Sequence, residues 1–185
     1  MMFDTGEIQE IEDILIHKEQ RANLQSNLLS KYSNSSLMVF TLNIPGPIKN
    51  NPMIEQVFRQ GQQSIQQMFL KKKVEMTYTK EINLPSGLDW YVIVTEAPLN
   101  LKKWLVTLEE QDALGRLFDL DVLFKKGEQI TIVSRQALNH GERPCFICGK
   151  SAKVCARNRA HTVKEMQKKI EQIVADSLKG ALKHA

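Results

Sequence analysis

The chain has 185 residues, of which 42% are hydrophobic, and its formal net charge is +4. A chain of this length can bury a substantial core in one domain without disulfides. Its longest stretch without a charged residue, 32–48, contains serines, asparagines and two prolines, so no segment resembles the ~20 apolar residues that cross a bilayer. The charge is also too small to indicate a nucleic-acid-binding protein by itself.

In chain order, the first expected element is a helix over residues 7–30, because apolar residues recur there three, four or seven positions apart. Its expected buried face consists of Ile8, Ile11, Leu15, Ala22 and Leu29. A β-rich run at 37–44 predicts a strand that ends at the turn Pro45-Gly46-Pro47. A second helix is expected over 53–70.

The remaining expected elements are strands at 74–78 and 90–95, a helix at 99–111, a hairpin of 117–124 and 129–133, and a helix at 162–182. Five strands interleaved with four helices predict an α/β or α+β fold, a mixed sheet with flanking helices. A C-terminal Cys/His segment and helix follow it. We expect a single domain over residues 1–185, with its core in 1–142 and the Cys/His segment and last helix in 143–185.

Two carboxylates lie two positions apart inside the apolar run 117–124. Because alternate residues of a strand point to opposite faces, Asp119 and Asp121 are expected on the same face. Two carboxylates about 7 Å apart repel each other, and a divalent cation between them makes the arrangement favourable. Mg²⁺ combines one or two protein carboxylates with phosphate oxygens, so the pair indicates phosphate chemistry, with Arg116 placed to hold a phosphate. The alternative is a solvated face of an edge strand.

All three cysteines lie close together, and a histidine follows them. Cys145, Cys148, Cys155 and His161 supply the four ligands that a tetrahedral zinc site requires. An odd number of cysteines argues against a secreted disulfide framework, and we expect a cytoplasmic protein. The alternative to a structural zinc site is a set of free thiols beside a solvated histidine.

The same part of the chain is strongly basic. Residues 143–169 contain eight lysines and arginines and one glutamate. Such a concentration of charge attracts polyphosphates, nucleic acid or an acidic protein. A solvated helix face is the alternative interpretation.

Several motifs, taken in order, resemble one family. They are Lys18-Glu19-Gln20-Arg21, Asn43-Ile44-Pro45-Gly46-Pro47-Ile48-Lys49, Leu114-Gly115-Arg116-Leu117-Phe118-Asp119-Leu120-Asp121-Val122, Ser134-Arg135, and Arg143-x-Cys145-x-x-Cys148 with Cys155-Ala156-Arg157 and His161. Over roughly residues 10–175 the chain is similar to the citrate lyase holo-[acyl carrier protein] synthases, which are phosphoribosyl-dephospho-coenzyme A transferases.

The resemblance implies an enzyme that moves the phosphoribosyl-dephospho-CoA group of 2'-(5''-triphosphoribosyl)-3'-dephospho-CoA to a serine of the citrate lyase acyl carrier subunit, with release of pyrophosphate. It also implies a nucleotidyltransferase-like sheet in which Asp119 and Asp121 hold Mg²⁺ and Arg116 acts with them. The expected substrate-binding residues are Arg21, Lys49, Gly115, Arg135 and Arg157. The basic stretch 150–169 is the expected docking surface for the acidic carrier. Membrane and nucleic-acid partners are not expected.

The chain departs from the family pattern in two places. Asp112-Ala113 occupies the position of a family His-Pro, so no general-base role passes to this chain there, and Lys18 occupies the position of an arginine. Two alternatives remain open at this point: the equivalent transferase for the malonate decarboxylase carrier, and a small zinc-dependent nucleic-acid-binding module. The second leaves the acidic pair unexplained, because carboxylates on a binding face repel nucleic acid.

Overall fold

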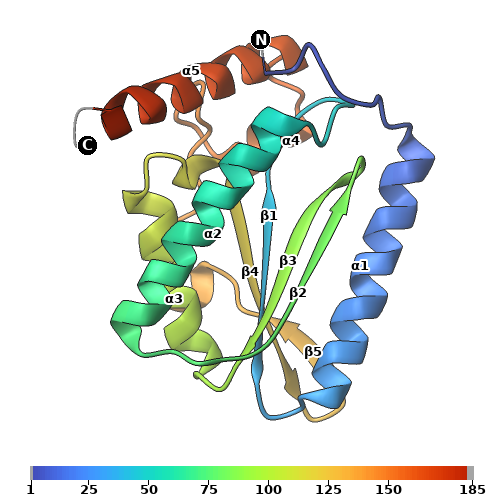
Figure 1. The fold of residues 1–185 in the computed structure, drawn as a ribbon, viewed down its shortest axis with the longest axis vertical. Coiled ribbons are helices and arrows are strands. Elements are labelled where there is room, and N and C mark those ends of the chain that lie inside the picture. The colour runs from blue at the N-terminus through green and yellow to red at the C-terminus, as the bar shows by residue number, and fades with distance from the viewer. Residues whose placement is uncertain (1, 183–185) are drawn as a thin grey trace.

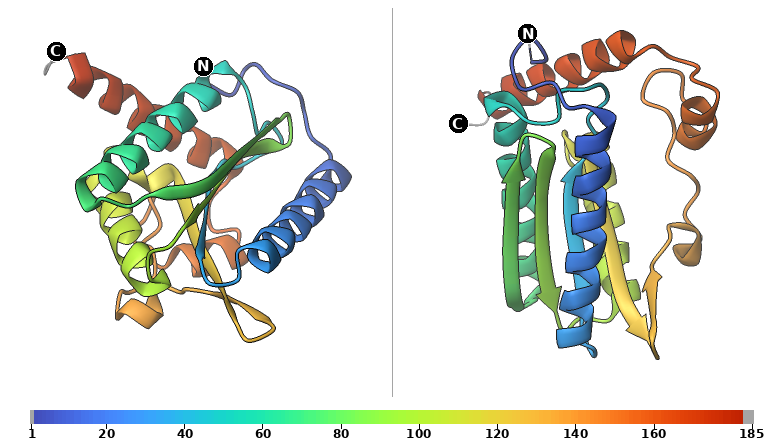
Figure 2. Two further views of the ribbon diagram at one scale, coloured as in Figure 1. Left: turned by 60° about the horizontal axis from the view of Figure 1, so that its bottom comes forward. Right: turned by 90° about the vertical axis from the view of Figure 1, so that its right-hand side faces the viewer.

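The computed structural model describes residues 2–182, and the side chains of residues 2–177. A five-stranded sheet in the order β2-β3-β1-β4-β5 has α1 on one face and α2 and α3 on the other (Figures 1 and 2). The elements are α1 (Ile11–Lys31), β1 (Ser36–Leu42), α2 (Pro52–Lys72), β2 (Met76–Leu84), β3 (Gly87–Val94), α3 (Pro98–Gln111), β4 (Phe118–Lys126), β5 (Gln129–Ile132), α4 (Ala152–Arg157) and α5 (Val163–Leu182), with short 3-10 turns at Gly115–Leu117 and Gln136–Leu138.

The predicted α+β class is confirmed, and every strand pairing in the described sheet is antiparallel. From the sequence we expect a mixed sheet, with both parallel and antiparallel neighbours, and the observed neighbours are all antiparallel. The helical crossover through α2 joins β1 to β2, which are parallel to each other but are separated by β3, and α3 joins β3 to β4 around β1 in the same way. Because each crossover skips one position, no two parallel strands become neighbours.

The larger part of the core lies between the sheet and the α2–α3 layer. Phe40 of β1 stacks on Phe58 of α2, with ring centroids 4.7 Å apart, and meets Phe118 of β4 edge to face at 5.3 Å. Gly61 lets α2 approach this closely, because a Cβ there would lie 2.4 Å from Cζ of Phe40. Aromatic packing at this position therefore fixes α2 against β1 and β4.

The predicted buried face of the first helix is wrong except at Leu29, because Ile8, Ile11, Leu15 and Ala22 are exposed. Ile11 and Leu15 are more than half exposed, whereas the buried residues of the helix are His17, Leu28 and Leu29. The C-terminal half of α1 packs on the sheet through its leucines, while its middle places a polar side chain over β3. The apolar pattern did not predict the burial of His17, because a polar side chain does not contribute to that pattern.

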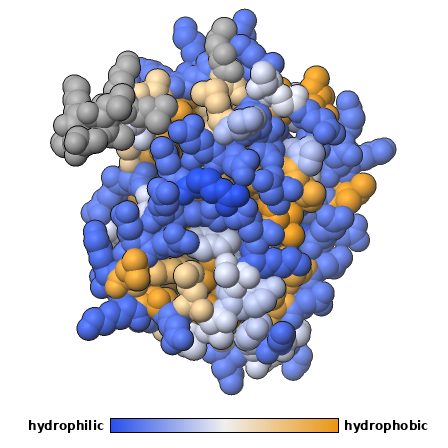
Figure 3. Space-filling view, in the orientation of Figure 1, coloured by the Kyte–Doolittle hydropathy of each residue, from blue (hydrophilic) through white to orange (hydrophobic). Residues whose placement is uncertain are grey.

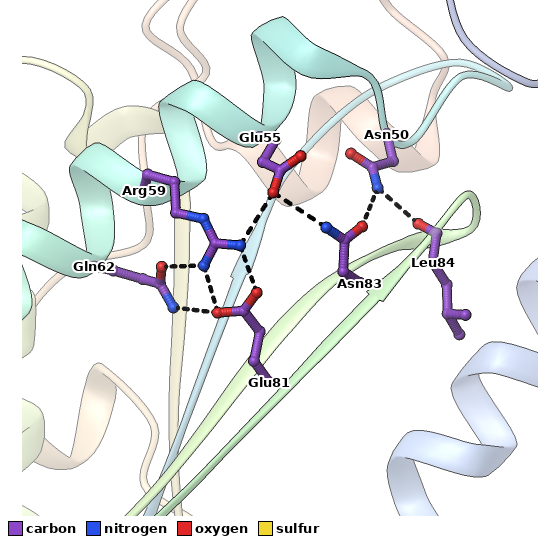
Figure 4. Close-up of polar contacts among 7 residues, drawn as sticks. All are labelled: Asn50, Glu55, Arg59, Gln62, Glu81, Asn83 and Leu84. Atoms are coloured by element: carbon purple, nitrogen blue, oxygen red, sulfur yellow. Dashed lines mark hydrogen bonds and ion pairs between the residues drawn. The ribbon is translucent and has the colours of Figure 1, made fainter.

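A polar network holds α2 to the edge strand β2 (Figure 4). Arg59 donates hydrogen bonds to both carboxylate oxygens of Glu81, at 2.5 and 2.6 Å, and to Glu55 at 3.0 Å. Gln62 and Asn83 extend the network on either side. Figure 3 shows a mostly hydrophilic surface on this side of the molecule, with separate apolar patches. The network closes the edge of the sheet farthest from the acidic pair.

The last helix, predicted over 162–182, crosses one end of the sheet beside the N-terminal segment (Figure 1). Ile170 and Val174 join the main core, and Glu171 accepts a hydrogen bond from the backbone N–H of Met2 at 2.7 Å. Gln167 donates to the carbonyl oxygen of Pro45 at 3.2 Å. Within residues 2–182, no helix has both the length and the apolar character that a membrane crossing needs.

Candidate functional site

The acidic pair lies on the sheet face that carries α1. Asp119 pairs with Thr41 of β1, and Asp121 pairs with Val39. Val39 packs in the core beneath α1, so both carboxylates are on that face, as the strand period predicts. Asp119 is exposed and Asp121 is half-buried. The pair is therefore open to a ligand at one carboxylate and partly removed from water at the other.

A buried lysine lies behind the pair. Lys102 of α3 donates a hydrogen bond to the backbone carbonyl oxygen of Leu120, the residue between the two aspartates. Burial raises the pKa of the Asp121 carboxyl and the charge of Asp119 raises it further, whereas Lys102 lowers it. Glu109 also raises the pKa of Asp121, and Arg143 lowers it. Three carboxylates thus share this partly desolvated site with two cations, and a bound divalent cation would balance the remaining negative charge.

A cavity of about 200 Å³, which we call the α1 cavity, adjoins the pair on one side. Its polar lining consists of His17, Lys18, Arg21, Thr41, Asn43, Lys49, Ser86 and Asp119. Lys49 donates a hydrogen bond to the carbonyl oxygen of Ile44 at 2.7 Å. Burial lowers the pKa of the Lys49 ammonium, and the charge of Lys18 lowers it further. Three cationic side chains share this space, so it favours an anion with several negative charges.

The arginine of this cavity is held from behind by the sheet. The Asp89 carboxylate on β3 is fully buried and lies 2.8 Å from Nη2 of Arg21. It also accepts hydrogen bonds from His17 at 2.8 Å and from the hydroxyl of Tyr91 at 2.9 Å. Burial acts to raise the pKa of Asp89, but the His17 hydrogen bond and the Arg21 charge bring it below its ordinary value. Asp89 is therefore a buried, ionised group with three partners.

A second cavity, of about 360 Å³, adjoins the pair on the side of α3, and we call it the α3 cavity. Its charged lining is Lys102, Glu109, Asp119, Asp121, Arg135, Glu142, Arg143 and Lys153. The buried Glu109 binds Nη1 of Arg135 at 2.6 Å and also pairs with Arg143. Asp119 lines both cavities. The acidic pair thus lies at the junction of two spaces, each of which has cationic side chains in its wall.

The sequence-predicted residues fall in different places. Arg21 and Lys49 line the α1 cavity, and Arg135 lines the α3 cavity. Arg116 is half-buried, donates a hydrogen bond to the carbonyl oxygen of Pro144, and lines neither cavity. A Cβ on the buried Gly115 would lie 2.4 Å from the carbonyl oxygen of Glu109, so this glycine lets the 3-10 turn Gly115–Leu117 approach the end of α3.

Arg157 lies on α4, at the surface. Its side chain is exposed and lines neither the α1 cavity nor the α3 cavity. The neighbouring Cys155 turns inward instead and is buried. The structure thus brings the predicted Cys/His segment to the same side of the molecule as the α3 cavity, while Arg157 remains on its outer surface.

The three cysteines and the histidine come together as the sequence predicts. Their four ligand atoms all lie within 4.8 Å of one another. Sγ of Cys148 is 3.5 Å from Sγ of Cys155 and 3.3 Å from Nε2 of His161. Ligand bonds of about 2.3 Å in a tetrahedron would place two sulfurs about 3.8 Å apart. The cluster can therefore bind a metal ion of this coordination with little movement.

The turn that carries the first two cysteines is preformed. The N–H of Gly149 donates to the carbonyl oxygen of Cys145 at 2.9 Å, and Gly149 adopts a φ of +75°. Burial acts to raise the pKa of the Cys145 thiol, but backbone N–H groups of Cys148 and Ile147 bring it below its ordinary value. These N–H groups stabilise a thiolate, which is the form that binds metal.

A third cavity, of about 630 Å³, adjoins the Cys/His cluster, and we call it the cluster cavity. Its lining includes Asn43, Pro45, Phe146, Ala156, Val163 and Met166. Asn43 also lines the α1 and α3 cavities. A single residue at the end of β1 thus borders all three spaces, and a long ligand that lies at the acidic pair can extend from one to another.

Sequence reasoning missed His17, Asp89, Lys102 and Glu109 as parts of this site. A signal was present for the last three, because each is a charged residue within an apolar strand or on the apolar face of a helix. Asp89 lies in the apolar strand β3, and Lys102 and Glu109 lie seven positions apart on α3. A charge in such a position needs a partner, but sequence alone does not show which one.

Comparison with known proteins identifies a match for almost the whole chain. The family model described as apo-citrate lyase phosphoribosyl-dephospho-CoA transferase matches residues 9–177. A protein of Streptococcus pyogenes serotype M3, called a probable apo-citrate lyase phosphoribosyl-dephospho-CoA transferase, is 38% identical over 92% of this chain and 88% of its own length. A protein of the same description from Vibrio cholerae serotype O1 is 32% identical over 90% of this chain and 92% of its own length.

Proposed function

The chain belongs to the apo-citrate lyase phosphoribosyl-dephospho-CoA transferase family, and we propose that the reaction takes place at the acidic pair, between the α1 and α3 cavities. The chain is a transferase that acts on apo-citrate lyase. Its donor is 2'-(5''-triphosphoribosyl)-3'-dephospho-CoA, and its acceptor is a serine of the acyl carrier subunit. The observation that carries the proposal is that Asp119 lines both cavities.

Asp119 and Asp121 hold Mg²⁺ in this proposal. The two carboxylates share one face of β4, one exposed and one half-buried, with a single buried lysine behind them. Bound Mg²⁺ supplies Lewis-acid polarisation of a phosphoryl oxygen and charge neutralisation. The donor set fits the ion, because Mg²⁺ is commonly held by one or two carboxylates together with substrate phosphates.

The α1 cavity binds the terminal phosphates of the donor. Lys18, Arg21 and Lys49 present positive charge beside the exposed carboxylate Asp119. Negative charge grows on the departing pyrophosphate during the transfer, and preorganised cations stabilise it there. The repulsion between Lys18 and Lys49 that lowers the pKa of Lys49 is relieved when the phosphates bind.

The transfer is a displacement at phosphorus. The serine oxygen of the carrier forms a bond to the α-phosphorus of the triphosphate, the bond from that phosphorus to the bridging oxygen of the β-phosphate breaks, and pyrophosphate leaves. The proton of the serine hydroxyl passes to water in the same reaction. The carrier then bears the phosphoribosyl-dephospho-CoA group through a phosphodiester.

We place the dephospho-CoA part of the donor in the cluster cavity. This cavity is lined mainly by apolar side chains, including Phe146 and Met166, and it meets the other two cavities at Asn43. A donor whose triphosphate lies at the acidic pair can therefore extend its nonreacting end into a less polar space. Remote binding of this kind contributes to orientation of the reacting phosphate.

The metal that we assign to Cys145, Cys148, Cys155 and His161 is Zn²⁺ in a structural role. Three thiolates and one imidazole are a closed ligand set, which leaves no position for substrate. The site joins α4 to the turn at 145–149 and forms one wall of the cluster cavity. None of the three cysteines is in a disulfide, which is consistent with the cytoplasmic location that we propose.

The carrier docks on the basic surface of α4 and α5. Lys153 and Arg157 lie one helical turn apart on α4, and Lys164 and Lys168 do so on α5, and all four are exposed. Acyl carrier proteins are typically acidic, so this surface offers complementary charge. It adjoins the cluster cavity, to which α4 and α5 both contribute.

The proposal is tested with the purified chain, the triphosphoribosyl donor and apo carrier proteins, by mass spectrometry of the carrier and a pyrophosphate assay. We expect the citrate lyase carrier to gain the mass of the prosthetic group, with one pyrophosphate released per group attached. A carrier with its acceptor serine changed to alanine should gain nothing. No mass gain with the wild-type carrier, or equal labelling of a malonate decarboxylase carrier, would contradict the proposed acceptor.

A further inference from the structure

The fully buried Asp89 is the centre of a set of contacts that the transfer, as described, does not use. Its carboxylate meets His17, Arg21 and Tyr91 at 2.8, 2.8 and 2.9 Å. Burial of an ionised carboxylate is costly unless it is paired and hydrogen-bonded. The position therefore has a strong requirement for its partners, and two of them come from α1.

His17 and Arg21 lie one helical turn apart on α1, and both line the α1 cavity. Asp89 itself is not among the residues that line this cavity. One carboxylate thus fixes two side chains that face the cavity while it stays behind them. An effect of Asp89 on ligand binding would therefore be exerted through these side chains.

The guanidinium of Arg21 is held from behind by the sheet, through Asp89 and the hydroxyl of Tyr91, and part of the side chain remains exposed. Nη2 lies 2.8 Å from Asp89, and about a third of the side chain is exposed. Nε is buried and has no hydrogen-bond partner among the described residues. Because guanidinium carries five N–H donors in a rigid fork, a contact at one nitrogen sets the direction of the others. Because Arg21 lines the α1 cavity and about a third of its side chain is exposed, the guanidinium can also donate to an anion there.

The ring of His17 is fixed in a similar way. Since an ionised carboxylate can only accept, Nε2 donates to Asp89. On the other side of the ring is Gly87, with φ of +145°, where a Cβ would lie 3.2 Å from Cε1. Because Gly87 has no side chain, there is room for the His17 ring. The hydrogen bond to Asp89 turns the Nε2 edge of that ring away from the cavity.

We propose that Asp89 is a positioning residue that orients the guanidinium of Arg21 toward the α1 cavity, where the guanidinium binds the polyphosphate of the donor substrate. The inference rests on the proposed function in one respect, that the α1 cavity takes phosphates. It adds a residue outside the cavity on which the affinity of that cavity depends. Arg21 and Asp89 then act on phosphate binding as one unit, and their effects should not be additive.

Calorimetric titration with inorganic tripolyphosphate tests this without any turnover. Asp89→Asn and Arg21→Gln should each weaken binding about tenfold, in keeping with the loss of one charge-assisted hydrogen bond. The double variant should bind no more weakly than Arg21→Gln alone. Glu81→Gln is the matched control, because it removes the carboxylate partner of Arg59 on the α2 face of the sheet, away from the α1 cavity, and its affinity should equal that of the wild type.

Each outcome has a defined meaning. Unchanged affinity in folded Asp89→Asn, or multiplied losses in the double variant, overturns the inference. If Asp89→Asn does not fold, Asp89→Glu replaces it as the test variant, because it keeps the charge and displaces it by one methylene. Unchanged tripolyphosphate affinity in Asp89→Glu also overturns the inference. A wild-type protein that fails to bind tripolyphosphate contradicts the proposed use of the α1 cavity, and this result is distinguishable because it precedes any variant.

Discussion

Lys102 of α3 donates its hydrogen bond to the backbone carbonyl oxygen of Leu120, which separates the two aspartates of β4. Lys102 is therefore a buried counter-charge of the acidic pair, in addition to Arg143. Its charge lowers the pKa of Asp121, against the effects of burial and of Asp119. The relationship links a residue of the helical layer to the acid–base state of the two carboxylates that we propose as metal ligands on the opposite face of the sheet.

Lys102→Met should therefore move the acid limb of the pH–rate profile to higher pH. Without the lysine charge the pKa of Asp121 rises, so a higher pH is needed to obtain the carboxylate that binds Mg²⁺. Lys103→Met, an exposed position on the same helix, is the control. Initial rates from pH 5 to 9 measure the shift, and an unmoved acid limb in Lys102→Met would show that the lysine has no electrostatic effect on the pair.

The contribution of Asp89 to stability should depend on pH. Its folded-state pKa lies below the ordinary value of 3.8, so its stabilisation is fully present above that value and is lost as pH falls through the folded pKa. Urea unfolding at several pH values should show a smaller loss of stability on acidification in Asp89→Asn than in the wild type. Asp176→Asn, an exposed carboxylate on α5, should behave like the wild type. Equal slopes in all three proteins would contradict the buried ion pair.

The Cys/His cluster should contain about one zinc per chain. Elemental analysis of the purified protein measures it, and Cys155→Ser should lose the metal together with thermal stability, because structural zinc contributes folding energy directly. Val154→Ser, an exposed neighbour on α4, should retain both. Protein that is metal-free and equally stable with and without a chelator would identify the cluster as free thiols.

Charge reversal on α5 should weaken carrier binding. Lys164→Glu with Lys168→Glu is expected to raise the KM for the carrier about tenfold and to leave the KM for the donor unchanged, because the acidic carrier meets repulsion at its docking surface. Lys71→Glu with Lys80→Glu makes the same change in net charge on exposed positions of α2 and β2. If both double variants raise the KM equally, the effect is one of net charge and α5 is not the docking surface.

Local patterns in the sequence were sufficient for most of the fold. The strand period placed Asp119 and Asp121 on one face, and the helical spacing located α2, α3 and α5 within a few residues of their bounds. The cysteine spacing also predicted a cluster whose ligand atoms converge. Each of these features depends on residues close together in the chain, where backbone geometry determines direction.

The parts that could not be predicted depend on distant partners. Asp89 and Arg21 are separated by 68 positions, and nothing local indicates that α1 lies over β3. The exposed Ile11 and Leu15 were placed in the core for the same reason, because the helix turns a polar residue inward. Glu109 joins Arg135 and Arg143 from a different element. Buried ion pairs across elements are set by tertiary packing, which periodicity does not describe.

The mass of the carrier after incubation with the wild type, Asp119→Asn and Asp121→Asn, in Mg²⁺ or in EDTA, is the most direct test of the acidic pair as the site of transfer. We expect full modification only with the wild type in Mg²⁺, and rates at least about a thousandfold lower in both variants. Their melting temperatures should not fall, because each substitution removes a repulsive charge. Modification at the wild-type rate by either folded variant, or in EDTA, would contradict the account.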